Sequence, residues 1–191
     1  ELAKKPTPRE LIDKLRGIFW QVKEDEDGVV VSVQPRWSGL RGSNIDLTLV
    51  HLRELPELQE LRIEHSRITP AGLVHLKGLK KLRKLELFFN QGITDAGLAH
   101  LKGLTELEYL SLVEKKPMVT DAGLVHLKRM TKLKVLKFGD GLRVTNAGVA
   151  HLRGLTELET LHLPIERVTN AGLAYLKGMR KMKNLVLITH P

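Results

Sequence analysis

The sequence has 191 residues, of which 42% are hydrophobic, and a formal net charge of +9 from 31 Lys and Arg against 22 Asp and Glu. Its length is that of one domain, and its leucines are sufficient for one continuous core. No stretch is long and apolar enough for a membrane-spanning helix, and the absence of cysteine excludes disulfides and thiolate chemistry. The composition does not indicate a cellular compartment.

Residues 1–28 are predicted to form an N-terminal capping helix followed by a turn. Thr7, Pro8 and Glu10 have the spacing of a capping box with proline at the first helical position. We expect this helix to cover the open end of the structure that follows, and a partner-binding helix is the alternative. Its apolar face, at helical spacing, consists of Leu11, Leu15, Ile18, Phe19 and Val22.

Residues 29–191 consist of internal repeats of about 25 residues. The unit is clearest in 85–110, where a Leu-x-Leu pair is followed by a polar turn, by Thr-Asp-Ala-Gly-Leu and then by leucines three residues apart. The predicted division is a degenerate repeat 29–60, repeats 61–84, 85–109, 110–135, 136–160 and 161–184, and a partial repeat 185–191.

The segment 82–90, LRKLELFFN, fits the leucine-rich-repeat consensus, and 93–98, ITDAGL, is similar to repeats of F-box-associated and related bacterial proteins. This resemblance implies an α/β solenoid, a curved right-handed β-α superhelix with a parallel sheet on the concave side and short helices on the convex side. One N-terminal helix is too little for an F-box. A continuous asparagine ladder is not expected, because other residue types stand at the position of Asn90. They are Ser66, Lys115, Gly141 and Glu166.

Each repeat is predicted to contain a short strand and a helix of about two turns. Leu85 and Leu87 have the alternation of a half-buried strand. Thr94 has the chemistry of a helix N-cap, and Asp95 after it suits the positive end of the helix dipole. Glycines that follow the helices are predicted as left-handed C′ residues. They are Gly78, Gly103, Gly154 and Gly178.

The outward positions of the strands vary between repeats while the leucine framework hardly changes. We predict that they form a protein-binding surface on which Phe88, Tyr109 and Val113 make one apolar anchor. Strand alternation places Phe88 outward and Phe89 inward. The identity of the protein partner is left open. The predicted surface consists of Lys84, Glu86, Phe88, Phe89, Tyr109, Ser111, Val113, Glu114, Val135, Lys137 and His162.

A basic residue recurs near the end of each predicted helix. This row either is solvated and complements the helix dipole, or binds an anionic polymer such as nucleic acid or an acidic polysaccharide. Interleaved glutamates and an aromatic content of only 4% make nucleic acid an unfavoured ligand. The row consists of Arg53, Lys77, Lys102, Lys128, Arg153 and Lys177.

No residue pattern indicates catalysis, a metal or a cofactor, so we predict a non-catalytic protein. One histidine recurs per repeat, but helices packed about 8–10 Å apart hold such side chains too far apart for one zinc ion. The apolar strand 185–188 is predicted to be an open edge, where the chain continues or meets another molecule, including a second copy. The recurring histidines are His51, His75, His100, His126 and His151.

Overall fold

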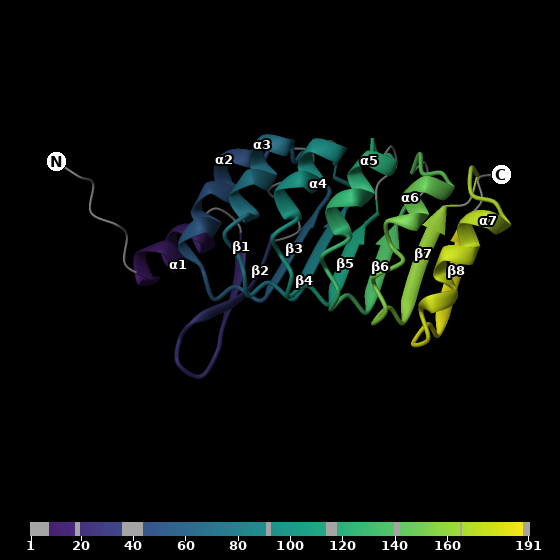
Figure 1. Cartoon of the computed structure of the whole chain (residues 1–191). Coiled ribbons are helices and arrows are strands. Elements are labelled where there is room, and N and C mark those ends of the chain that lie inside the picture. Colours follow the sequence, from purple (N-terminus) through teal and green to yellow (C-terminus); the bar gives the residue numbers. More distant parts are fainter. Residues whose placement is uncertain are drawn as a thin grey trace.

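The computed structural model describes residues 8–17, 20–35, 44–90, 93–113, 118–139, 142–164 and 166–188. Its strands form one eight-stranded sheet in chain order, parallel from β2 to β8 (Figure 1). The predicted α/β solenoid is therefore confirmed. The strands are β1 (Trp20–Glu24), β2 (Val30–Pro35), β3 (Glu60–Glu64), β4 (Lys84–Phe88), β5 (Tyr109–Leu112), β6 (Val135–Phe138), β7 (Thr160–Pro164) and β8 (Asn184–Ile188).

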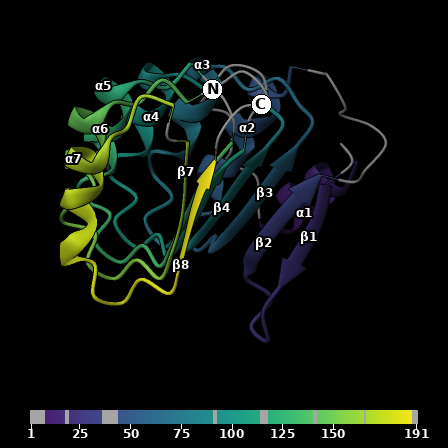
Figure 2. The same cartoon turned by 90° about the vertical axis from the view of Figure 1, so that its right-hand side faces the viewer.

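The helices of the repeats lie on the opposite side of the solenoid from the strands (Figure 2). Neighbouring strands pack closer together than neighbouring helices, so the sheet is on the inner side of the curve. The α-helices are α1 (Pro8–Gly17), α2 (Asp46–Leu49), α3 (Pro70–Leu73), α4 (Asp95–Leu101), α5 (Asp121–Leu124), α6 (Asn146–Ala150) and α7 (Asn170–Leu173). Four of them continue as 3₁₀ turns, η1 (Val50–Glu54), η2 (Val74–Leu76), η3 (Val125–Leu127) and η4 (Ala174–Gly178).

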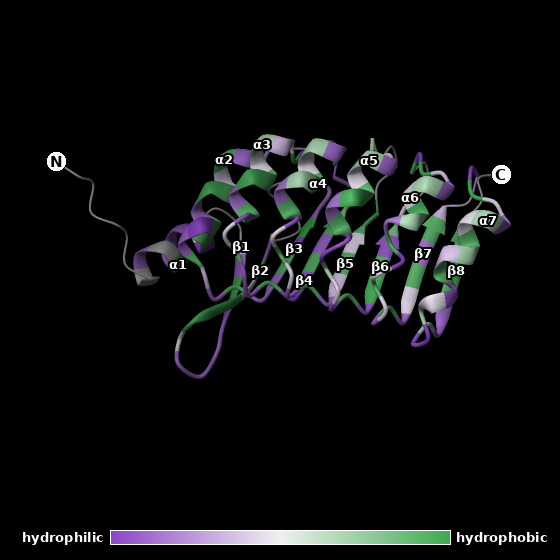
Figure 3. Cartoon of the chain, viewed as in Figure 1, coloured by the Kyte–Doolittle hydropathy of each residue, from purple (hydrophilic) through white to green (hydrophobic). Residues whose placement is uncertain are grey.

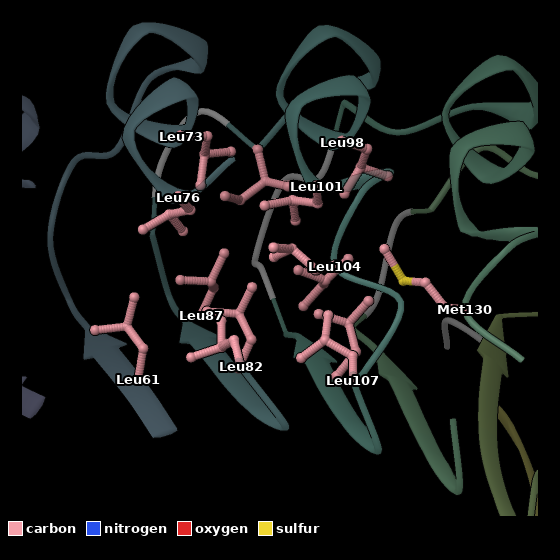
Figure 4. Packing of buried hydrophobic residues seen from close by; sticks show 14 of the residues in the cluster. Leu61, Leu73, Leu76, Leu82, Leu87, Leu98, Leu101, Leu104, Leu107 and Met130 are labelled. Atoms are coloured by element: carbon pink, nitrogen blue, oxygen red, sulfur yellow. The ribbon is translucent and has the colours of Figure 1, made fainter. Parts of the chain in front are cut away.

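Leucines fill the space between the sheet and the helices. Leu87 points inward from β4, Leu98 and Leu101 come from α4, and Leu104 and Leu107 come from the connection to β5 (Figure 4). All five are completely buried. Figure 3 shows hydrophobic residues along the strands and helices, with hydrophilic residues in the loop that joins β1 to β2. The repeats thus share one continuous core, because each buries its apolar faces against the next.

A second set of contacts joins the repeats at the start of each helix. The Asp95 carboxylate accepts hydrogen bonds from the backbone N (2.8 Å) and Oγ1 (2.7 Å) of Thr120 in the next repeat. A Cβ on Gly123 would lie 2.3 Å from Asp95 Oδ1, so glycine is required there by close approach. The equivalent pairs are Asp46–Thr69, Asp121–Thr145 and Asn146–Thr169.

The N-terminal segment differs from the prediction. Helix α1 ends at Gly17, and Val22 lies in β1, which pairs antiparallel with β2 across the turn at Gly28. A hairpin provides ladder hydrogen bonds that extend the sheet, which a longer helix could not do. Trp20 of β1 is completely buried, so the hairpin and α1 together cover the first repeat. The predicted cap residues Thr7, Ile18 and Phe19 are outside the described residues.

The helix ends also differ from the prediction. Gly28 is the only described glycine with a positive φ, so the predicted left-handed C′ conformation does not occur at Gly78, Gly103, Gly154 or Gly178. The chain instead leaves the helices through bonds between residues three apart, such as Leu104 N to Leu101 O at 2.9 Å. Such bonds satisfy the last carbonyls of a short helix without a left-handed residue.

The strand β8 ends the described part of the sheet. Leu185 and Leu187 occupy inward positions, yet they are 42% and 39% exposed, whereas the equivalent Leu161 and Leu163 of β7 are completely buried. This difference follows from position alone, because no described repeat packs against β8.

Candidate protein-binding surface

The outward side chains of β3 to β8, here called the sheet face, lie in rows set by the parallel register. The first row crosses the start of the strands, and the second crosses their middle. The first row is Glu60, Lys84, Tyr109, Val135, Thr160 and Asn184. The second row is Arg62, Glu86, Ser111, Lys137, His162 and Val186.

The predicted apolar anchor is divided between two ends of the sheet face. The register pairs Tyr109 with Lys84, and Lys84 precedes Phe88 by four residues, or about 13 Å of strand. Phe88 is instead near Val113, whose carbonyl accepts a 2.7 Å hydrogen bond from the backbone N of Phe89. Tyr109 therefore does not form one cluster with Phe88 and Val113. The repeat pattern predicts such a cluster, and in this respect the prediction is wrong.

Phe89 is exposed rather than inward. Its φ of 51° leaves the strand conformation, so the alternation that predicts an inward side chain ends at Phe88. The residue is 40% exposed, and its ring stacks on His65, with ring centroids 5.0 Å apart. His65, also at a positive φ of 52°, was absent from the predicted surface. Its position in the repeat relates it to Phe89. His65 precedes Ser66, and Phe89 precedes Asn90, which is the equivalent of Ser66 in the next repeat.

Tyr109 lies between two lysines from the neighbouring strands. The Nζ atom of Lys84 in β4 lies 5.2 Å from the centre of the Tyr109 ring, and the Nζ of Lys137 in β6 lies 5.5 Å from it. An ammonium group at this distance is attracted by the negative face of an aromatic ring. The three residues therefore form one aromatic and basic group in the centre of the sheet face.

Glu86 is only 6% exposed although it belongs to an outward row. Its carboxylate lies 3.5 Å from Nζ of Lys84 and 3.8 Å from Nε of Arg62. Arg62 also pairs with Glu64 and lies over the Phe88 ring, 5.6 Å from its centre. Glu86 is therefore already paired within the chain and offers little carboxylate surface to a partner.

Ser111 and His162 are the neighbours of Lys137 in the second row. Ser111 is completely buried, and its Oγ has no hydrogen-bond partner among the described residues. Burial and the nearby charge of Lys137 lower the pKa of His162 below 6.5, so its ring is neutral at pH 7. Val135 is half-buried in the first row, and Glu114 is outside the described residues.

The basic row is fully accessible. Each of its six residues, from Arg53 to Lys177, is exposed, and none forms an ion pair with another described residue. The glutamates that interleave with the row in sequence are paired elsewhere, each with a lysine of the next repeat at 2.5–2.7 Å. The pairs are Glu57–Lys81, Glu106–Lys132, Glu108–Lys134, Glu157–Lys181 and Glu159–Lys183.

The recurring histidines are all half-buried. Burial lowers the pKa of His51 and of His75; the charge of Lys14 adds to the effect at His51, and that of Arg53 at His75. Within the described ranges, no group of three or more His, Asp or Glu could hold a metal ion. None of the described helices has the length and apolarity to cross a bilayer.

An open hollow of about 610 Å³ lies between the β1–β2 turn and the start of β3. Four of its eight lining residues carry a carboxylate, and the hollow is separated from Tyr109 by β4. It is lined by Lys23, Glu24, Asp25, Glu26, Val31, Ser32, Gln59 and Glu60.

Residues 78–101 match a family model described as Leucine Rich repeat. The crystal structure of internalin C2 from Listeria monocytogenes is similar, with 25% identity, a TM-score of 0.61 and coverage of 73% of this chain. Internalin F of the same bacterium has 24% identity, a TM-score of 0.57 and coverage of 71% of this chain. Comparison of the sequence with curated proteins gave no match.

These matches support the leucine-rich-repeat superfamily for this chain, as its repeats predicted, and the bacterial neighbours agree with the predicted bacterial type of repeat. The matched region covers 55% of internalin C2 and 36% of internalin F. The fold supports an interaction scaffold in general terms.

Proposed function

We propose that the chain is a non-catalytic scaffold that binds a protein partner on the sheet face, centred on Tyr109. The observation that carries this proposal is the half-buried Tyr109 ring between Lys84 and Lys137 on three adjacent strands. Tyrosine is one of the residues that most often dominate the energy of an interface, because its ring is large and it can also form a hydrogen bond.

The position of this group in the fold also supports the proposal. The strands β4, β5 and β6 are hydrogen-bonded to one another, and their inward leucines are buried. A partner would therefore meet side chains that are already ordered, and binding would cost little conformational entropy. No cofactor is part of this proposal. The resemblance of the repeats to those of F-box-associated proteins stays a prediction.

The experiment is a pull-down from a cell extract with purified wild type and two tyrosine variants. Tyr109→Ala removes the proposed anchor, while Tyr175→Ala removes the other tyrosine of the chain, which is 42% exposed on η4. We expect a partner retained by the wild type and by Tyr175→Ala to be lost with Tyr109→Ala, provided that circular dichroism shows all three to be folded. Equal retention by both variants would contradict the proposal.

A second candidate function is binding of an anionic polymer by the basic row. The observation that favours it is that Glu57, Glu106, Glu108, Glu157 and Glu159 are paired with other lysines and so leave the row unneutralised. The row is charged along several repeats, which suits a linear polyanion.

A heparin column tests this candidate directly. The variant Lys102→Gln/Lys128→Gln should elute at lower salt than the wild type, because fewer counterions are released on binding. The matched control is Lys81→Gln/Lys132→Gln, which removes the same charge from lysines that are already paired. Equal elution of both variants would exclude a role specific to the row.

A further inference from the structure

The basic side chains of the sheet face differ from those of the remaining surface. Among the lysines and arginines whose side chains the structure describes, Lys84 and Lys137 are half-buried and all others are exposed. Lys84 has an ion-pair partner in Glu86 at 3.5 Å. Lys137 has none among the described residues, although it has lost part of its hydration.

This arrangement is unfavourable for the free protein. A partly desolvated charge without a counterion raises the free energy of the folded state, and contact with an aromatic ring compensates only a part of that cost. Elsewhere in this chain, exposed lysines such as Lys134 and Lys183 have a glutamate at 2.6–2.7 Å. Of the two half-buried lysines, Lys137 is therefore the one without an ion pair among the described residues.

We propose that the Lys137 ammonium, with Tyr109 and His162 beside it, binds a side-chain carboxylate of an acidic peptide segment in the protein partner. This inference rests on the proposed function and adds the chemical class of the segment. Charge complementarity identifies the ligand group, because Lys137 is the only charged residue on the described sheet face from β5 to β8.

The neighbours of Lys137 fit such a segment. His162 is its register partner in β7 and is neutral at pH 7, so it can donate one hydrogen bond to a carboxylate oxygen without adding a charge. The half-buried Val135, the register partner of Tyr109 in β6, provides apolar surface beside the tyrosine ring. We therefore expect an acidic residue flanked by apolar residues, because such a segment would cover both kinds of surface.

The test begins with a random-peptide display library selected on the folded wild-type protein, with the Tyr109→Ala variant used for counter-selection. The expected result is enrichment of peptides with an acidic residue among apolar ones. If the wild type selects no peptide over Tyr109→Ala, the proposed function itself is contradicted. If the selected peptides carry no acidic residue, only the carboxylate inference is overturned.

Affinities of one selected peptide then test the role of Lys137. Lys137→Met should weaken binding on the order of tenfold or more, whereas Lys132→Met, which removes the same charge from an exposed lysine outside the sheet face, should change it less than about twofold. The peptide in which the acidic residue is replaced by its amide should bind the wild type and Lys137→Met equally, because the interaction is then absent from both complexes. Equal affinity of the wild type and Lys137→Met for the acidic peptide would overturn the inference.

Discussion

Asp95 in one repeat accepts two hydrogen bonds from Thr120 in the next, and Thr120 in turn caps the helix α5 through its Oγ1. The pairs Thr94-Asp95, Thr120-Asp121 and Thr145-Asn146 therefore have two functions. The threonine caps its own helix, and the acidic or amide residue holds the following repeat. These bonds fix the distance between repeats on the side opposite the strand ladder, and so they help to position the sheet face.

Removing one of these carboxylates should destabilise the solenoid. Asp121→Ala loses the hydrogen bonds from the backbone N and Oγ1 of Thr145, so the free energy of unfolding should fall by about 1–3 kcal/mol. Asp121→Asn should cost less, because Asn146 already makes equivalent bonds to Thr169. Urea denaturation followed by circular dichroism measures both. An alanine variant as stable as the asparagine variant would contradict this role.

Adding a methyl group beside a carboxylate should also destabilise the fold. In Gly123→Ala the new Cβ would lie 2.3 Å from Asp95 Oδ1, so the repeats must separate, at a cost of about 1–3 kcal/mol. Gly154→Ala is the matched control, because no atom lies within 4 Å of its Cβ position. Thermal unfolding should give a lower midpoint for Gly123→Ala alone. Equal midpoints would show that the close approach has no energetic consequence.

Stability should fall in mild acid because of the partly buried histidines. The pKa of His75 is lowered by burial and by Arg53, against a smaller opposing effect of Asp46. The unfolded chain therefore binds a proton at a higher pH than the folded chain does. The contribution of His75 to the free energy of unfolding is complete above pH 6.5 and is lost as the pH falls through the lower pKa of the folded state. Urea midpoints of wild type and His75→Gln, measured across this range, should show a shallower pH dependence in the variant. Identical slopes would contradict a contribution from His75.

The left-handed residue at the end of β4 should be replaceable without loss of the fold. Phe89 is 40% exposed at a φ of 51°, a conformation that asparagine adopts more readily than phenylalanine. Phe89→Asn should therefore leave the thermal midpoint unchanged or raise it, although the stacking on His65 is lost. A clearly lower midpoint would show that the aromatic stack outweighs the backbone strain.

The repeat pattern of the sequence was sufficient to predict the strands, the helices and the sheet, because leucine spacing and threonine caps are local signals. The hairpin β1–β2 was missed, since Val22 fits a helical face as well as a strand and only pairing with Val33 distinguishes them. The inter-repeat bonds were also missed. Asp95 was interpreted through the helix dipole of its own repeat, and its partner Thr120 is 25 residues away.

The candidate site was predicted in part. The outward positions of Tyr109 and Lys137 follow from strand alternation. The position of Phe88 relative to Tyr109 depends on the register between strands, which no local pattern fixes. A continuous asparagine ladder was not expected. Asn90 joins its repeat to the preceding one, since its Oδ1 accepts a hydrogen bond from Ser66 N at 3.1 Å and its Nδ2 donates one to Ile63 O at 2.9 Å. The burial of Glu86 depends on Arg62 in the preceding repeat and so was not evident from its own strand.

Hydroxyl-radical footprinting of the protein with and without a bound partner tests the central claim most directly. The two tyrosines of the chain report opposite sides of the solenoid, Tyr109 on β5 and Tyr175 on η4. Binding on the sheet face should reduce oxidation of Tyr109 and leave that of Tyr175 unchanged. Protection of Tyr175 with Tyr109 still oxidised as in the free protein would contradict binding on the sheet face.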